Sequence, residues 1–126
     1  MSDVLARQAE LAAKRVSPAV VAEMGIEVVT LIMTQVFAFL ASCKNRETPD
    51  PAAVQASVIE ENEANPKRLL RRTARRIRAS ADEPMTKQQS FALAKASIEQ
   101  AIEMPEETAM ACAMSVPDDL HVEDVE

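Results

Sequence analysis

The sequence predicts an all-α protein, folded as a compact bundle of about five helices with a short sixth. Its composition is poor in the residues that sheets favour: the 126 residues include one Gly, three Phe and neither Trp nor Tyr, and the hydrophobic 48% is dominated by aliphatic residues and Met. Hydrophobic residues recur at three- and four-residue spacing along much of the chain. Proline repeatedly follows Ser, Asp or Asn, an order typical of helix starts.

A chain of 13.8 kDa fits one domain, and we expect residues 1–114 to form it. Residues 115–126 are predicted to be an acidic, flexible tail, because they combine many charges with no helical pattern. With few aromatic rings, the core must consist of aliphatic side chains and Met, which bury less area per residue. This composition favours an oligomer in which another molecule covers part of the hydrophobic surface.

The first helix is expected over about 2–16, with Ser2 as its N-cap and Asp3 in its first turn. The second, over 18–43, is predicted to be the central hydrophobic helix. Its polar stripe consists of Glu23, Glu27, Thr30 and Thr34, continued by Ala38 and Ala41. A helix apolar on so many sides belongs inside a bundle or at an oligomer interface. The residues predicted to form that interface are Val28, Leu31, Ile32, Val36 and Phe39.

Two other structures compete for the segment 18–43. Residues 26–32 are rich in β-branched side chains, so a short strand after Gly25 is an alternative. A membrane span is disfavoured because the uncharged run 28–42 is shorter than the roughly 20 residues needed to cross a bilayer. Glu23 and Glu27 would each cost about 2 to 3 kcal/mol near the bilayer centre. We therefore predict no membrane span.

A basic helix is predicted over 66–80, where seven of the twelve residues from Lys67 to Arg78 are Lys or Arg. At about 100° per residue, all seven fall on one half of the helix. They are Lys67, Arg68, Arg71, Arg72, Arg75, Arg76 and Arg78. The other half holds Leu69, Leu70, Thr73, Ala74, Ile77 and Ser80. This is the candidate binding surface of the chain.

Three further helices complete the prediction. The helix over 51–64 carries three acidic residues at its end, where they oppose the helix macrodipole and would be more stable beside cations: Glu60, Glu61 and Glu63. Thr86 and Gln89 form a capping-box pattern at the start of a fifth helix, which extends to about residue 104. Pro105 begins a short sixth helix that ends near residue 114.

The charge distribution bears on what the basic helix binds. The chain has 14 basic and 20 acidic residues. Outside this helix there are seven basic and 20 acidic residues, so the rest of the chain has a net charge of 7 − 20 = −13. The favoured partner is therefore a protein with an acidic surface, including another copy of this chain. Nucleic acid is the alternative, although the chain has no Trp or Tyr to stack on bases. A solvated or internally paired face and a membrane surface remain open as well, the last least favoured.

The two cysteines, Cys43 and Cys112, are distant in sequence and are expected to be buried, reduced thiols, as in a reducing compartment. The N-terminus lacks the pattern of a secretory signal, so we predict a cytoplasmic protein.

No catalytic pattern is recognisable. The only imidazole, His121, lies in the predicted tail, and the chain has no glycine-rich phosphate loop and no CxxC or HExxH motif. Glu23 and Glu27 are four residues apart, the spacing that carboxylates have in metal sites of helical bundles. No His accompanies them, so no metal site or cofactor is expected. The sequence thus predicts a non-enzymatic assembly or adaptor subunit, with a regulator that binds the nucleic-acid backbone as the alternative.

Overall fold

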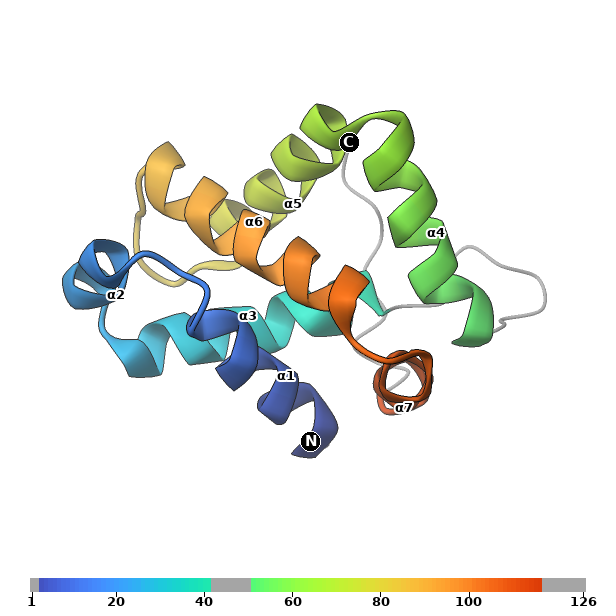
Figure 1. Cartoon of the computed structure of the whole chain (residues 1–126). Helices are drawn as coiled ribbons and strands as arrows, with labels where there is room; N and C mark the ends of the chain where they lie inside the picture. Colours follow the sequence, from blue (N-terminus) through green and yellow to red (C-terminus); the bar gives the residue numbers. More distant parts are fainter. Residues whose placement is uncertain (1–2, 42–50, 117–126) are drawn as a thin grey trace.

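The computed structural model describes residues 3–41 and 51–116, in which every regular element is an α-helix (Figure 1). The predicted all-helical class is confirmed. The helices are α1 (Asp3–Ala13), α2 (Pro18–Met24), α3 (Ile26–Leu40), α4 (Pro51–Ala64), α5 (Pro66–Ser80), α6 (Lys87–Glu103) and α7 (Glu106–Met114). The alternative of a strand after Gly25 is wrong, because this segment is the first half of α3.

The prediction of one continuous helix over 18–43 is also wrong. The chain turns at Gly25, and the axes of α2 and α3 differ by 102°. Gly25 adopts φ 92° and ψ 137°, a conformation that side chains other than hydrogen disfavour. Its N–H donates to the Val21 carbonyl oxygen at 2.7 Å, and its own carbonyl oxygen accepts from the Val29 N–H at 3.0 Å. Gly25 therefore makes the last hydrogen bond of α2 and the first of α3. The bend adds one helix to the predicted six.

The core is organised around two helices, α3 and α6. α3 packs against α1, α2, α5, α6 and α7, and α6 packs against α1, α3, α4 and α5. Figure 1 shows α2 at the edge of this arrangement, and none of its residues is buried. The centre of the fold is thus the segment 26–40 together with α6, whereas residues 18–24 are peripheral.

Small side chains let the central helices approach one another. Ala9 and Ala12 on α1 and Ala94 on α6 are fully buried. The Ser97 hydroxyl, also fully buried, lies 2.9 Å from both the Leu93 carbonyl oxygen and the Met33 sulfur. A core poor in aromatic rings is closed in this way by alanine contacts and a few aliphatic side chains.

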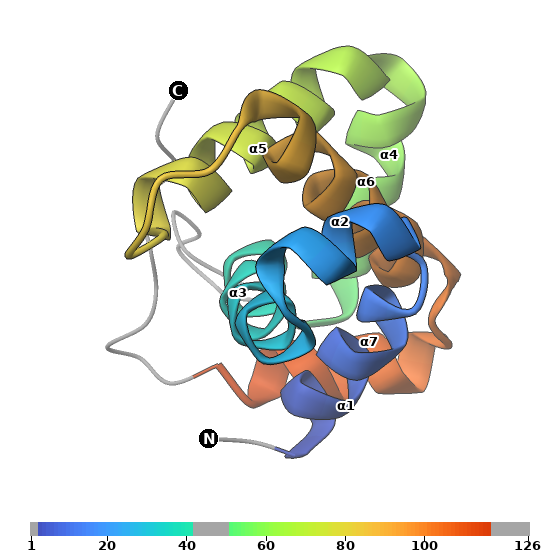
Figure 2. The same cartoon turned by 90° about the vertical axis from the view of Figure 1, so that its left-hand side faces the viewer.

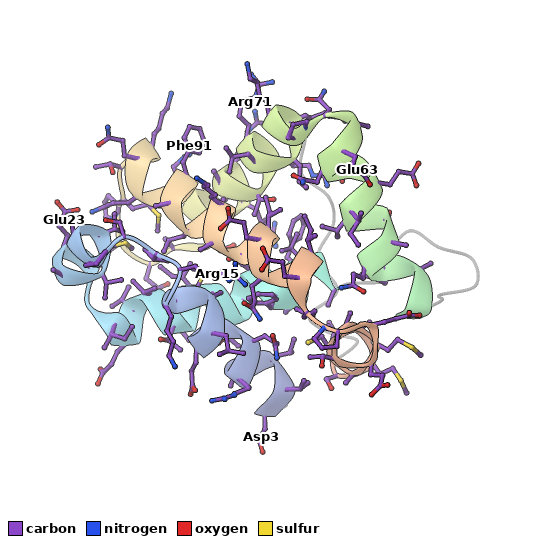
Figure 3. All side chains as sticks on the ribbon, viewed as in Figure 1. Asp3, Arg15, Glu23, Glu63, Arg71 and Phe91 are labelled. Carbon is purple, nitrogen blue, oxygen red and sulfur yellow. The ribbon has the colours of Figure 1, made fainter. Side chains whose placement is uncertain are left out.

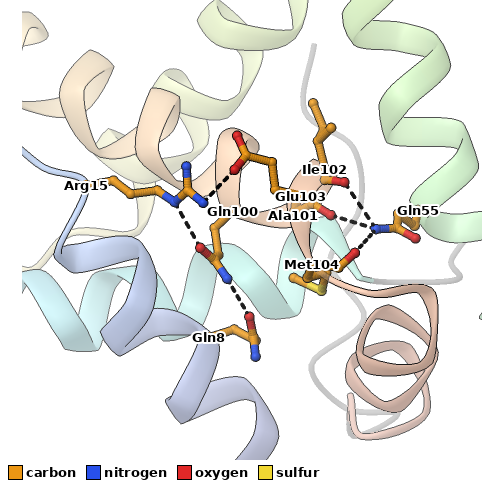
Figure 4. Close-up of polar contacts among 8 residues, drawn as sticks. All are labelled: Gln8, Arg15, Gln55, Gln100, Ala101, Ile102, Glu103 and Met104. Carbon is orange, nitrogen blue, oxygen red and sulfur yellow. Dashed lines mark hydrogen bonds and ion pairs between the residues drawn. The ribbon is translucent and has the colours of Figure 1, made fainter.

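Polar side chains join α1 to α6 (Figure 4). Arg15 donates through Nε to Gln100 Oε1 at 2.9 Å and through Nη2 to Glu103 Oε1 at 2.8 Å. Gln100 in turn donates to Gln8 Oε1 at 2.7 Å. The hydrogen bond between Arg15 and Glu103 raises the pKa of Arg15 and lowers that of Glu103. These contacts fix the end of α1 along the second half of α6.

Gln55 of α4 contacts the same C-terminal end of α6. Its Nε2 lies 2.8 Å from the Met104 carbonyl oxygen, 3.0 Å from that of Ala101 and 3.4 Å from that of Ile102 (Figure 4). These carbonyl groups belong to the last turn of a helix, where intrahelical donors run out. A side chain of α4 therefore caps α6.

The C-terminal part of the described chain packs into the core. Cys112 is 2% exposed, and burial raises the pKa of its thiol to about 11. The prediction of a buried thiol is thus confirmed for Cys112, while Cys43 lies outside the described residues. Val116 is buried as well, so packing continues past the predicted boundary at residue 114. The rest of the predicted tail, 117–126, and with it His121, lies outside the described residues.

No single helix within residues 3–41 and 51–116 is long and apolar enough to cross a membrane. Only α2 and α3, taken together across their bend, reach the length and hydrophobicity of a membrane span. The same residues contain no group of three or more His, Cys, Asp or Glu side chains placed to hold a metal ion.

Candidate docking surface

The basic helix α5 forms as the sequence predicts. Asn65 caps it by accepting the Arg68 N–H at 3.1 Å, and Pro66 occupies its first turn. Four residues of the predicted apolar half are buried: Leu69, Thr73, Ala74 and Ile77. This face packs on α6, α4 and α3, which orients the opposite, basic half outwards.

The seven predicted cations divide into two groups. Lys67, Arg68, Arg71 and Arg75 are exposed, and Figure 3 shows Arg71 pointing away from the body of the molecule. Arg68, Arg71, Arg72 and Arg75 line a shallow hollow of about 280 Å³. Several guanidinium groups around one hollow give a surface that can hold carboxylates or phosphates.

Arg72 is held by its own chain. Its Nη2 lies 2.7 Å from Glu61 Oε1, and the two side chains are only 17% and 26% exposed. The prediction that acidic residues at the end of α4 lie beside cations is therefore confirmed for Glu61. Glu60 and Glu63 are exposed instead, and Figure 3 shows Glu63 on the outer side of α4.

Arg76 and Arg78 also contact the fold. The Arg76 guanidinium lies 5.7 Å from the centre of the Phe39 ring, within the range of a cation–π interaction. Arg78 donates through Nη1 to Ser90 Oγ at 2.7 Å and lies 6.0 Å from the Phe91 ring centre. On a helical projection, Arg72 and Arg76 fall near one boundary of the basic half, and Arg78 falls near the other, beside the exposed Lys67. The projection therefore indicates contact with neighbouring helices for Arg72 and Arg76, but it does not distinguish Arg78 from Lys67.

The five residues predicted to form an oligomer interface also divide. Val28 and Leu31 are 47% and 54% exposed, whereas Ile32, Val36 and Phe39 are buried by their own chain. All five nevertheless line two adjoining hollows on one side of α3, of about 220 Å³ and 300 Å³. The exposed part of the predicted interface is therefore the rim formed by Val28 and Leu31, and the remainder is its floor.

The predicted polar stripe of residues 23–41 does not exist as one surface, because the bend at Gly25 separates Glu23 from Glu27. Thr34, which is 7% exposed, donates its hydroxyl to the Thr30 carbonyl oxygen at 2.9 Å. Glu23 accepts a hydrogen bond of 3.3 Å from Gln89 Nε2 and so connects α2 to the start of α6.

Comparisons with protein-family models, curated proteins and solved structures find no match to this chain.

Proposed function

We propose that this chain is a non-enzymatic assembly or adaptor subunit, which oligomerises or docks onto a larger complex through α5 and α3. The observation that carries the proposal is a row of exposed cations on α5, which we call the exposed basic row: Lys67, Arg68, Arg71 and Arg75. Arg71 and Arg75 are its centre. α5 contains no acidic residue, so this row presents one sign of charge. Such a surface accelerates and orients association with an acidic partner more than it strengthens the final complex.

The apolar part of the proposed surface is the outer side of α3. Val28 and Leu31 are each about half exposed, and they line the same hollow. Apolar side chains gathered on a surface mark protein interaction sites more often than isolated ones do. A basic row and an apolar strip on neighbouring helices together fit a docking subunit.

The test measures the size of the particle that contains the chain. In extract of the native source, the wild-type chain is expected to elute with a complex larger than itself or, when purified, to scatter light as an oligomer at micromolar concentration. The double variant Arg71→Glu/Arg75→Glu should shift toward the monomer position. The matched variant Lys14→Glu/Lys95→Glu changes two other exposed cations and should elute as wild type. A monodisperse monomer in both settings contradicts the proposal.

The second candidate function is binding of a nucleic-acid backbone, and the hollow lined by four arginines favours it. Because Arg72 pairs with Glu61, the cations available to phosphates are mainly those at the exposed row. DNA and RNA affinity measured between about 50 and 200 mM salt should then fall steeply, and Arg71→Ala/Arg75→Ala should reduce the salt slope by about 2. An absence of binding at 50 mM salt rejects this function.

A further inference from the structure

A continuous groove runs along α3, on the side that faces α5 and the connection from α5 to α6. The hollows of about 220 Å³ and 300 Å³ share Ile32, Gln35 and Ser80 in their walls, so they are two parts of one depression. Its floor consists of buried apolar side chains: Ile32, Val36, Phe39 and Ile77. Figure 2 views α3 nearly end-on, with α5 and the 81–86 connection above it.

The rim of this groove is apolar and exposed. Leu31 and Val28 stand on its α3 side at 54% and 47% exposure, and Met24 and Met85 add two partly buried thioethers. Leucine, valine and methionine around a hydrophobic depression give a surface that accommodates apolar side chains of a partner, since methionine adapts its shape.

The two ends of the groove carry opposite charge. Arg76 lines the part next to Phe39. Glu23, Asp82 and Glu83 line the other part, near the turn between α2 and α3. An occupant is therefore expected to present a carboxylate at the Arg76 end and a cation at the opposite end.

The backbone around the groove indicates the secondary structure of the occupant. In the half next to Phe39 the walls are the helices α3 and α5, whose backbone groups are hydrogen-bonded within each helix, so they offer no strand edge for an extended peptide. The other half lies between α3, the end of α2 and the 81–85 connection. α3 has 15 residues, a length of about 22 Å at 1.5 Å per residue. α3 lines the groove from Val28 to Phe39, so an occupant helix of at most this length is expected.

We propose that this groove binds an amphipathic helix of a partner protein, whose apolar face carries residues at i, i+4 and i+7, with a carboxylate near Arg76 and a Lys or Arg near Asp82 and Glu83. The proposal rests on the proposed docking function and specifies the partner segment. A second copy fits the groove less well. Among the helices described, α2, α3, α4 and α7 have no basic residue to meet Asp82 and Glu83, and the apolar sides of α1, α5 and α6 are already buried.

The probe is a displayed library of 15-residue peptides, selected against the full-length chain. Enriched peptides should be helical and apolar on one face, with acidic and basic residues at opposite ends. In fluorescence anisotropy, Leu31→Gln or Val28→Gln should lower the affinity of the chain for such a peptide by about tenfold. Met114→Gln is the matched control, since Met114 is 72% exposed and lines neither hollow, and it should leave the affinity unchanged.

A charge exchange tests the orientation. Arg76→Glu should weaken a peptide with an acidic end, and the same peptide carrying Lys at that end should regain affinity for the variant. Circular dichroism of each variant establishes that it is folded. The proposal is overturned if selection enriches no helix, if Leu31→Gln binds as tightly as wild type, or if light scattering shows a dimer that Leu31→Gln dissociates, which would make a second copy the occupant. If the groove binds no such helix while Arg71→Glu/Arg75→Glu still releases the chain from its complex, the proposed docking function is supported and the groove has no part in it.

Discussion

Arginines a few positions apart on α5 have quite different surroundings. Arg75 is exposed, Arg76 lies over the Phe39 ring and Arg72 is paired with Glu61. A guanidinium group can serve in all three settings because it is planar, weakly hydrated and always charged. The contribution of each arginine to stability and to binding must therefore be separated by position, not by residue type.

Arg72 should stabilise the fold through Glu61. We expect Arg72→Ala to lower the free energy of unfolding by about 1 to 2 kcal/mol, because a charged hydrogen bond of a partly buried pair is lost. Arg75→Ala, an exposed change in the same helix, should stay within about 0.5 kcal/mol of wild type. Urea unfolding of the single variants, of Glu61→Ala and of the double variant Glu61→Ala/Arg72→Ala gives the coupling energy. Additive losses would contradict the pairing.

Cys112 should react slowly while the protein is folded. The thiol is 2% exposed and its pKa is raised to about 11, so at pH 8 it has little thiolate and little access to reagent. In a Cys43→Ser background, a disulfide reagent should label Cys112 only after urea unfolds the chain. The folded pKa lies above the ordinary 9.0, so this group's contribution to stability is full below pH 9 and is lost as the pH rises toward 11. Rapid labelling of the folded chain at pH 8 would contradict this burial.

The helices themselves could largely be predicted from local sequence. α4, α5, α6 and α7 begin and end within about two residues of the predicted limits, since Pro, Asn and Thr at their starts act within a single turn. The bend at Gly25 could not be predicted from local sequence, because a lone glycine within a strongly apolar helical pattern is compatible with a continuous helix. Packing of α3 against α1 and α6 favours the bent arrangement, and these contacts are distant in sequence.

Gly25→Ala should destabilise the protein. The residue has a positive φ, and an added Cβ would meet no atom within 4 Å, so the cost comes from the backbone alone and is about 1 to 3 kcal/mol. Urea unfolding measures the loss, and a D-alanine in place of Gly25 is the matched control, because it accepts a positive φ. An alanine variant with increased stability and increased helical ellipticity would instead show that α2 and α3 merge.

Gln55 should stabilise the fold through its side-chain amide hydrogens. Gln55→Ala removes the donor to the end of α6 and should cost about 1 to 2 kcal/mol. Gln55→Glu should cost more at pH 7, because a carboxylate would face carbonyl oxygens at the negative end of the helix dipole. Gln88→Glu, an exposed change in the first turn of α6, serves as the control in thermal unfolding. Equal stability of Gln55→Glu and wild type would exclude the capping role.

The fold places its buried surface and its candidate docking surface on the same two segments. α3 contributes its inner side to the core and its outer side to the groove, and α5 is buried on one half and basic on the other. Periodicity predicted which half of α5 is polar, but not which of its cations contact Phe39, Glu61 or Ser90. Those contacts depend on how α3, α4 and α6 cross α5, and no single segment encodes that geometry.

Amide hydrogen exchange should follow this organisation. The amides of α3 and α6 are expected to exchange slowest, because these helices hold most of the core. α2 has seven residues, none of them buried, and should open locally and exchange far faster. Exchange followed by NMR or mass spectrometry compares the three helices within one sample. Equal protection of α2 and α3 would mean that α2 opens only when the whole protein unfolds.

The contact between Ser97 and the Met33 sulfur has a chemical consequence. Met33 is completely buried, whereas Met114 is 72% exposed. In a chain without Trp or Tyr, thioethers and thiols are the main targets of oxidants such as peroxide. Peroxide reaches Met114 before Met33, and a sulfoxide there adds a polar group to a side chain that already faces water. The same oxygen atom on Met33 would have to enter the buried core beside Ser97, so burial protects a thioether whose oxidation would disrupt the packing of α3 on α6.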